Sequence, residues 1–421
     1  MTFAHRLAQQ GYEVSIFESS DNLGGLTASW KIADITWDKF YHVILLSDQN
    51  LRSLLEELGL DDKIKWQQTK TGFYVNNKFY SMSNSLEFLK FSLLSIFDKL
   101  RLGLTIFYAS KIKNWKSLEN ILVEKWLRKW SGNNTFEKIW QPLLRAKLGE
   151  QYKVTSAAFI WATIQRMYAA RRGGMKTEMF GYVPGGYAVI LDKFKLKLIS
   201  ENVKIFTNHT AGKIEWVNNK AEVQFENGIS KQFDKIIVTI PSNKASKICS
   251  ALTDHEKKEL NDVKYLGVIC ASVILKEQIG EYYVTNIIDK NIPFTGIINM
   301  SALVDPKEFK GKILIYLPRY LNADDDEFLL SDDELKKKFT KALLEMYSMM
   351  KIDDIIEMQI ARAKEVFSLP TLGYSNHLPD KSVSASGVYI INSSHIVNGT
   401  LNNNEVVKLV DTCINEIQKR F

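Results

Sequence analysis

The sequence predicts an α/β protein with two domains, one of which is assembled from three separate stretches of the chain. Three observations support this prediction. Strand-like runs occur at the start, in the middle and at the end of the 421 residues. A helical, aromatic-rich block from 84 to 180 and a mixed block after 260 separate these runs. With 45% hydrophobic and 24% charged residues, the chain is long enough to form two cores.

Composition excludes several classes of protein. The net charge is +7, but basic and acidic residues are interleaved throughout, so we expect no nucleic-acid partner. Cys249, Cys270 and Cys413 are widely spaced and odd in number, which argues against a disulfide framework and a metal site. No run of about 18 uncharged apolar residues predicts a membrane span. We therefore expect a cytoplasmic protein without a metal.

The opening residues 1–18 predict a helix, a stop at Gly11 and a strand that ends on Glu18. In a dinucleotide-binding βαβ unit, an acid at the end of the second strand accepts hydrogen bonds from a ribose, about 20 residues after a glycine-rich turn. That turn is missing from this sequence, and we expect about a dozen residues of strand and turn to be encoded upstream. The alternative is that Glu18 is a solvated loop carboxylate.

The next elements are a helix closed by Gly59 and a hairpin whose turn contains Asn76 and Asn77. Residues 86–112 are rich in Leu and Phe but carry too many charges for a membrane span. They predict a pair of core helices. The alternative is an interfacial helix that gives the protein peripheral contact with a membrane.

The second half of the chain begins with two alternating strands around Asn218 and Asn219. The run that ends at Pro241 is continuously apolar and predicts a strand buried on both faces. Residues 262–320 predict strands with polar alternation. Ser331 and Glu334 then form a capping box at the start of a helix, and the chain closes with a strand, a loop and a helix.

Gly24 and Gly25 follow Glu18 closely, and glycines let backbone N–H groups approach a phosphate. Together, "ESSDNLGGLTASW" resembles the flavin-adenine-dinucleotide proteins of the flavin amine oxidase, protoporphyrinogen oxidase and phytoene desaturase superfamily. The resemblance recurs in four later segments: "ITWDKFYHVI", "MFGYVPGGYAVILDKF", the strand set from "AGKIEW" to "FDKIIVTIP", and "GVYIINSSHIVNGTLNNNEVVKL".

This resemblance implies a Rossmann-like, three-layer FAD-binding domain formed by residues 1–75, 181–260 and 365–421. Residues 76–180 and 261–364 would form an inserted α+β substrate domain. The helix N-terminus near Leu401 would face the pyrimidine edge of the flavin, where a reduced flavin carries negative charge. The FAD-binding residues implied by the resemblance are Glu18, Gly24, Gly25, Leu26, Tyr41, His42, Ile214, Pro241, Asn392, Ser393 and Leu401. Many relatives have an acidic Gly-Asp pair where this chain has Asn392 and Ser393.

The resemblance implies oxidation or desaturation of a small hydrophobic or amine-bearing substrate by hydride transfer to flavin N5. The catalytic residues are not identified by the sequence; the candidates are His42, Arg145, Lys147 and Tyr374. For each of these the alternative is a purely structural role. Arg171 and Arg172 favour an exposed loop over an anion site.

Two other functions remain open from the sequence. One is a redox-neutral, flavin-dependent mutase or isomerase. The other is a degenerate member of the fold that binds FAD or a partner without catalysis.

Overall fold

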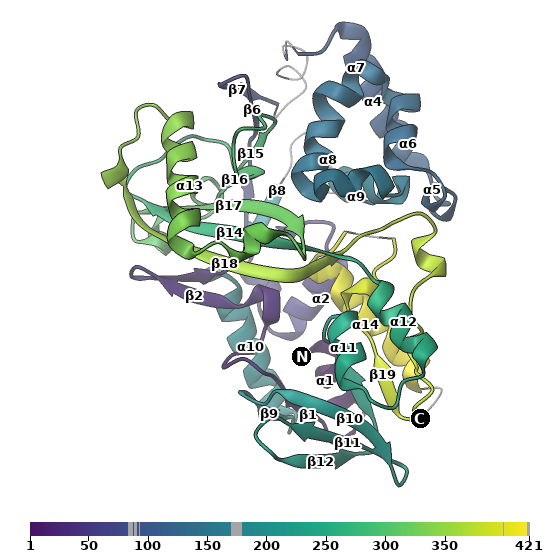
Figure 1. Ribbon diagram of the computed structural model, residues 1–421. Coiled ribbons are helices and arrows are strands. Elements are labelled where there is room, and N and C mark those ends of the chain that lie inside the picture. Colours follow the sequence, from purple (N-terminus) through teal and green to yellow (C-terminus); the bar gives the residue numbers. More distant parts are fainter. Residues whose placement is uncertain (83–86, 88–90, 92, 170–178, 399, 419–421) are drawn as a thin grey trace.

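The computed structural model describes residues 1–82, 87, 91, 93–169, 179–398 and 400–418 (Figure 1). Arg171 and Arg172, together with residues 86, 88–90 and 92 of the predicted helix pair, lie outside the described residues. From top to bottom, Figure 1 shows a helical block, a large sheet with a long helix on it, and a smaller α/β part.

The centre of the molecule is a seven-stranded mixed sheet in the order β18-β14-β17-β16-β15-β6-β7. Its strands are β6 (Thr71–Val75), β7 (Lys78–Ser81), β14 (Tyr265–Leu275), β15 (Val284–Ile287), β16 (Gly296–Asn299), β17 (Ile313–Asn322) and β18 (Ile355–Ser368). Helix α13 (Asp332–Met346) packs on one face of this sheet. The hairpin of β2 (Ser29–Ile32) and β3 (Ile35–Asp38) contributes to the core on the other face through Ile32 and Trp37.

Strand β14 differs from the prediction made for residues 262–320. All eleven of its residues are buried, so the polar alternation predicted over 262–320 is wrong there. The reason is that the strand lies between β17 and β18 and is covered on both faces. The continuous burial expected for the run before Pro241 is also wrong. Strand β13 (Ile236–Val238) has three residues, and only Val238 is buried.

The helical block lies at the upper right of Figure 1. Its helices are α4 (Ile96–Lys111), α5 (Lys116–Glu119), α6 (Val123–Ser131), α7 (Asn133–Thr135), α8 (Gln141–Leu148) and α9 (Ala157–Ala169). A π-helical turn, Phe136–Trp140, precedes α8. Of the predicted pair of core helices over 86–112, the described residues 93–112 contain α4, one face of which enters the core through Leu102 and Ala109. Most of residues 86–92, where the pair would begin, lies outside the described residues.

The α/β part brings together strands from the start, middle and end of the chain. Strand β1 (Ser15–Phe17) pairs in parallel with β9 (Lys204–Phe206), and β13 pairs in parallel with β19 (Val388–Ile390). There are also two three-stranded sheets. One contains β10 (Ala211–Val217), β11 (Lys220–Phe225) and β12 (Ser230–Phe233). The other contains β4 (Ile44–Leu45), β8 (Met179–Tyr182) and β5 (Lys65–Gln68), with β8 in the middle. The helices are α1 (Thr2–Ala8), α2 (Gln49–Glu57), α10 (Gly186–Ser200), α11 (Ser242–Ile248), α12 (Asp254–Asp262) and α14 (Asn403–Gln418). The predicted α/β class is confirmed.

The turn and the helix start that were predicted from short sequence motifs are both confirmed. Asn76 and Asn77 both have positive φ, 53° and 58°, as a type I′ hairpin turn requires. The capping box of Ser331 and Glu334 is formed in both directions. The domain boundary predicted after residue 75 divides this hairpin, because β6 and β7 both belong to the large sheet. The boundary predicted after residue 364 likewise falls inside β18.

Candidate functional site

Glu18 follows the last residue of β1 and lies beside the N-terminus of α1. Its carboxylate accepts hydrogen bonds from the backbone N–H of Ser20 at 2.9 Å and from Ser19 Oγ at 3.2 Å. Met1, the N-cap of α1, lies within electrostatic reach of this carboxylate. Since helix N-termini favour anions, this corner suits a ribose and its phosphate.

Gly24 and Gly25 form an open turn next to this corner. Their φ angles are 118° and 55°, and a 3-10 helix, Gly25–Thr27, begins there with Leu26 half-buried. A Cβ at Gly24 would lie 2.6 Å from Leu191 of α10, whereas a Cβ at Gly25 would meet no atom within 4 Å. The φ of 118° at Gly24 would strain any other residue, and the absence of a side chain at Gly25 leaves its backbone open to a ligand.

Ile214 and Pro241 are the predicted residues on β10 and after β13. Ile214 is buried, and its carbonyl oxygen accepts hydrogen bonds from the N–H and the hydroxyl of Ser250, at 3.0 and 3.2 Å. Pro241 is the N-cap of α11. The carbonyl oxygen of Ile214 is thus already paired within the protein.

A set of polar side chains meets where the first, middle and last segments of the chain adjoin the helical block. We call Asp38, His42, Asp48, Arg166 and Tyr187 the junction cluster. Asp38 Oδ1 accepts a hydrogen bond from the backbone N–H of Tyr187 at 2.9 Å, and the rings of His42 and Tyr187 lie 5.0 Å apart. Arg166 of α9 reaches Asp48 Oδ2 at 3.3 Å. Tyr187 lies within the electrostatic reach of both groups of this pair.

Helix α14 begins at the same place. The hydroxyl of Tyr187 faces Asn403, its first residue. Asn404 Oδ1 accepts hydrogen bonds from the backbone N–H groups of Asn50 and Leu51, at 2.9 and 3.2 Å. The N-termini of α14 and α2 are thereby joined, and both present the positive ends of their dipoles at this junction.

Three polar atoms of the junction cluster are buried with no hydrogen-bond partner among the described residues. They are His42 Nδ1, Arg166 Nε and the hydroxyl oxygen of Tyr187. Buried polar groups nearly always find a partner, so such atoms indicate a ligand or water that satisfies them. The residues present therefore fit a polar edge such as that of a flavin.

Burial shifts the protonation of this cluster strongly. It raises the pKa of Asp38 to about 8 and lowers that of His42 to about 4, because both would be charged far from water. Burial also raises the pKa of Asp48, against the opposing charge of Arg166. Near neutral pH the cluster thus holds neutral His42, largely neutral Asp38 and the cation of Arg166.

Lys147 on α8 lies next to the junction cluster. Its ammonium is 3.8 Å from the centre of the Tyr320 ring, and the hydroxyls of Tyr41 and Tyr320 are 2.6 Å apart. Burial lowers the pKa of Lys147, Tyr41 raises it, and Arg166 lowers it further. Lys147 forms no ion pair with an acidic side chain in the described part of the chain. A desolvated cation of this kind can meet negative charge on a ligand.

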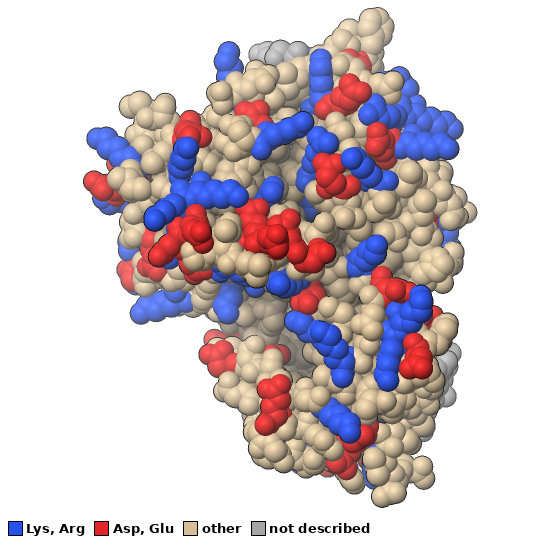
Figure 2. All heavy atoms as spheres, in the orientation of Figure 1, with Lys and Arg blue, Asp and Glu red and all other residues tan. Residues whose placement is uncertain are grey.

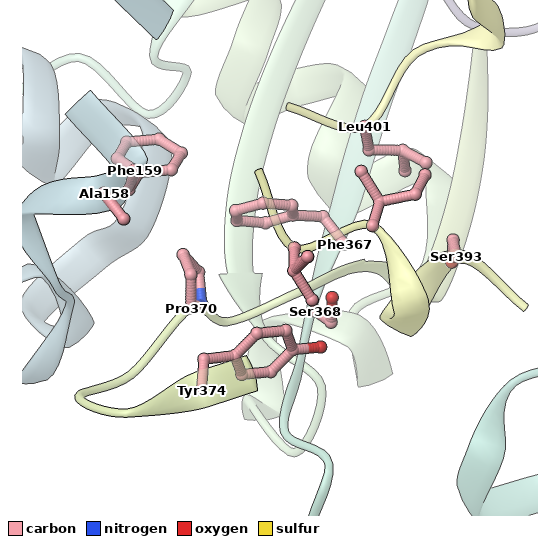
Figure 3. A pocket seen from close by; sticks show the side chains of 10 residues that line it. Ala158, Phe159, Phe367, Ser368, Pro370, Tyr374, Ser393 and Leu401 are labelled. Carbon is pink, nitrogen blue, oxygen red and sulfur yellow. The ribbon is translucent and has the colours of Figure 1, made fainter. Parts of the chain in front are cut away.

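A small pocket lies between the N-terminal end of α9 and the loop before α14 (Figure 3). It is lined by Ala158, Phe159, Phe367, Ser368, Pro370, Tyr374, Ser393, Ile396, Val397 and Leu401. Figure 3 shows the ring of Phe367 directed toward Phe159, and their centres are 5.8 Å apart. The free space is about 20 Å³, which is room for about one water molecule, so a larger ligand enters only when these side chains rotate.

Tyr374 and Asn392 are held by hydrogen bonds within the protein. The hydroxyl of Tyr374 donates to the carbonyl of Ser394 at 2.8 Å. Asn392 is buried; its Oδ1 accepts from the N–H and hydroxyl of Ser394, and its Nδ2 donates to the carbonyl of Ile240 and to Ser242 Oγ. These contacts join the end of β13 to the loop that lines the pocket, so Asn392 positions Ser393.

The structure thus brings together Tyr41 and His42, which were predicted from one motif, and Lys147, which lies on α8. Tyr374, Ser393 and Leu401 line the pocket between α9 and the loop before α14. Arg145 is directed elsewhere: it pairs with Glu150 at 2.9 Å, because residues two apart on a helix point to different sides. The sequence reasoning missed Asp38, Asp48, Arg166, Tyr187 and Tyr320. Only Asp38 and Tyr187 lie within motifs that could have indicated them.

Replacing Asp38 with Asn gives a pH-dependent test of this electrostatic description. The folded pKa of about 8 exceeds the ordinary value of 3.8, so the stabilisation present at low pH is lost as the pH rises from about 4 to about 8. Asn imitates the neutral acid and keeps the acceptor for Tyr187. The variant should therefore gain stability over the native chain with rising pH, by at most about 1.4 kcal/mol per unit. Urea unfolding near pH 5 and pH 8 measures this; an equal difference at both would contradict it.

Comparison with known proteins places the chain among flavoproteins. The family model of flavin containing amine oxidoreductases matches residues 1–364. Curated relatives are 15-cis-phytoene desaturases: that of Narcissus pseudonarcissus is 33% identical over 79 residues, which are 18% of this chain and 14% of the desaturase. The match thus spans about a seventh of the length of that relative.

Solved structures are similar over nearly the whole chain. A protein from Exiguobacterium sp. 255-15, described provisionally as a protoporphyrinogen oxidase, is 15% identical with a TM-score of 0.78, over 100% of this chain and 96% of the other. Putrescine oxidase bound to putrescine is 14% identical with a TM-score of 0.74, over 99% and 96%. Reduced UDP-galactopyranose mutase is 15% identical with a TM-score of 0.71, over 99% and 93%. At these identities the likeness shows the fold.

Proposed function

The chain belongs to the family of flavin containing amine oxidoreductases, and from this premise we propose that it binds FAD and oxidises or desaturates a small, mainly apolar substrate. The observation that carries the proposal is the junction cluster. Its buried, unpartnered atoms His42 Nδ1 and Arg166 Nε lie where the N-terminus of α14 meets the helical block.

Separate residues of the chain would hold the parts of FAD. Glu18 and the bare backbone at Gly25 suit the ribose and the diphosphate. His42, Tyr187 and the start of α14 suit the pyrimidine edge of the flavin ring. When bound, the flavin supplies the two-electron acceptor that takes a hydride from the substrate.

The charges at the junction favour an apolar or anionic substrate over a cationic amine. Lys147 has no acidic partner in the described part of the chain, Arg166 is paired with Asp48 at 3.3 Å, and burial keeps Asp38 largely neutral. The pocket between α9 and the loop before α14 is lined mainly by apolar and aromatic side chains, including Phe159, Phe367 and Leu401. These side chains would orient a hydrophobic substrate and exclude water.

A redox-neutral isomerase is the second candidate, since UDP-galactopyranose mutase shares the fold over 99% of this chain. A non-catalytic FAD-binding module is the third. Anaerobic mixing of the FAD-loaded protein with probes distinguishes them, the probes being an isoprenoid polyene, putrescine and UDP-galactopyranose. We expect the polyene to bleach the flavin absorbance stoichiometrically. Turnover of the sugar nucleotide without net bleaching would favour the mutase, and no response to any substrate class would favour the binding module.

A further inference from the structure

Helix α4 presents an apolar face to solvent. Six of its large hydrophobic side chains are exposed, with exposed fractions from 41% to 80%: Ile96, Phe97, Leu100, Leu104, Phe107 and Tyr108. At 3.6 residues per turn these positions fall within an arc of about 120°. A helix that packs on a core normally places polar residues on this side.

The opposite face fixes the orientation of the helix. Leu102, Thr105 and Ala109 are buried against the helical block, and Thr105 Oγ1 is 3.2 Å from Ser131 Oγ of α6. At the start of α4, Ser95 and Asp98 form a capping box. Because the inner face is already packed, the six outer side chains cannot turn inward.

Positive charge surrounds the apolar face. Residues 95–131 contain eight Lys or Arg and three Asp or Glu. The exposed cations are Arg101, Lys111, Lys113, Lys116, Lys125 and Lys129. Figure 2 shows Lys and Arg gathered at the upper right, over the part where Figure 1 draws α4 and α6.

The three acidic residues offset only part of this charge, since eight cations against three acids leave an excess of five positive charges over residues 95–131. Asp98 accepts hydrogen bonds in the capping box and from Asn134. Glu119 is buried and bonded to Ser375. Glu124 is paired with Arg128 at 2.8 Å.

Aromatic rings and cations are interleaved at the rim. Tyr108 stacks on Trp130 with their ring centres 4.1 Å apart, and the ammonium of Lys111 lies 5.3 Å from the ring centre of Phe107. Rings at the height of lipid headgroups beside Lys and Arg are typical of helices that lie in a membrane interface. Among the described residues, no helix combines the length and apolarity needed to cross a bilayer.

We propose that the outer face of α4 is a binding surface for anionic lipid bilayers, with its apolar side chains inserted and its cations on the headgroups. A second copy of this chain fits the surface less well. A symmetric contact would use the same patch on both copies, so the basic rim that contains Arg101 and Lys111 would face the equally basic rim of the other copy. The proposal does not depend on the proposed activity, because vesicle binding is measured without substrate.

Flotation of the full chain with vesicles tests this proposal. We expect binding to vesicles of phosphatidylcholine mixed with phosphatidylglycerol, weaker binding to phosphatidylcholine alone, and release at high salt. A triple variant, Leu100→Gln, Leu104→Gln and Phe107→Gln, should reduce the fraction bound at least about tenfold. Lys111→Gln alone should reduce it by about fivefold, and only on anionic vesicles.

The matched control is Leu196→Gln with Ile199→Gln on α10, whose side chains are 61% and 52% exposed, against 54% to 67% at the three test positions. It should bind vesicles like the native chain, and all variants should unfold at the same temperature. The proposal is overturned if the folded native chain does not float with anionic vesicles, or if the triple variant floats as well as the native chain. A third result would assign the face to a second copy of the chain instead: the native chain is a dimer that does not bind vesicles, and the triple variant is a monomer.

Discussion

Replacing Lys147 with Met is expected to lower the turnover number by about 100- to 1000-fold while FAD remains bound. Lys147 is desolvated, forms no ion pair with an acid in the described part of the chain, and lies against Tyr320 next to the junction cluster. Its charge is thus available to negative charge that develops on a ligand during the reaction. The measurement is the anaerobic rate of flavin reduction by the substrate found in the screen.

Arg145→Met is the matched control for this experiment. Arg145 lies on the same helix but pairs with Glu150 near the surface, so its loss should change the rate by no more than about threefold. An unchanged rate in the Lys147 variant, or an equal loss in both variants, would remove Lys147 from the site.

The second large effect concerns stability and follows from Gly267 in the middle of the large sheet. Between Leu266 and Val268 of β14 the register with β18 shifts, and extra residues of β18 bulge toward Gly267. A Cβ there would lie 2.6 Å from the carbonyl oxygen of Ala363 and 2.9 Å from the Cα of Lys364. We expect Gly267→Ala to lower the free energy of unfolding by about 3 kcal/mol. The same bulge precedes Phe367 and Ser368, so the apolar pocket should also be disturbed.

Gly103→Ala is the control, since a Cβ at this position of α4 would meet no atom within 4 Å. Ala is the better helix former, so this variant should gain up to about 1 kcal/mol. Urea unfolding of both variants measures the contrast. If Gly267→Ala were as stable as the native chain, the close approach of β18 to β14 would be wrong.

Sequence signals predicted those parts of the fold that local chemistry decides. Asn76 and Asn77 fix a turn by tolerating positive φ, and Ser331 and Glu334 fix a helix start. By contrast, the apolar run of β13 did not reveal how deeply it is buried. Burial depends on which elements cover a strand, and an isolated run carries no information on that point.

The sequence predicted only those residues of the candidate site that lie in recognisable segments. Tyr41 and His42 lie in a motif, and Lys147 was a candidate because its segment, residues 136–152, resembles a signature of the inserted domain. Asp48 and Arg166 were missed because they meet only when α9 packs against the start of α2, which is a contact between residues 118 positions apart. Arg145 was selected with Lys147, yet helix geometry separates the two side chains.

Titration of FAD into the purified chain, followed by the quenching of flavin fluorescence, tests the central claim most directly. We predict binding of one FAD per chain, weakened about 10- to 100-fold by Glu18→Ala, since charge-assisted hydrogen bonds to the ribose would be lost. Glu13→Ala should leave the affinity unchanged, because Glu13 is exposed and pairs with Lys204. Absence of FAD binding, or equal affinity of the native chain and the Glu18 variant, would contradict the assignment of this corner to the nucleotide.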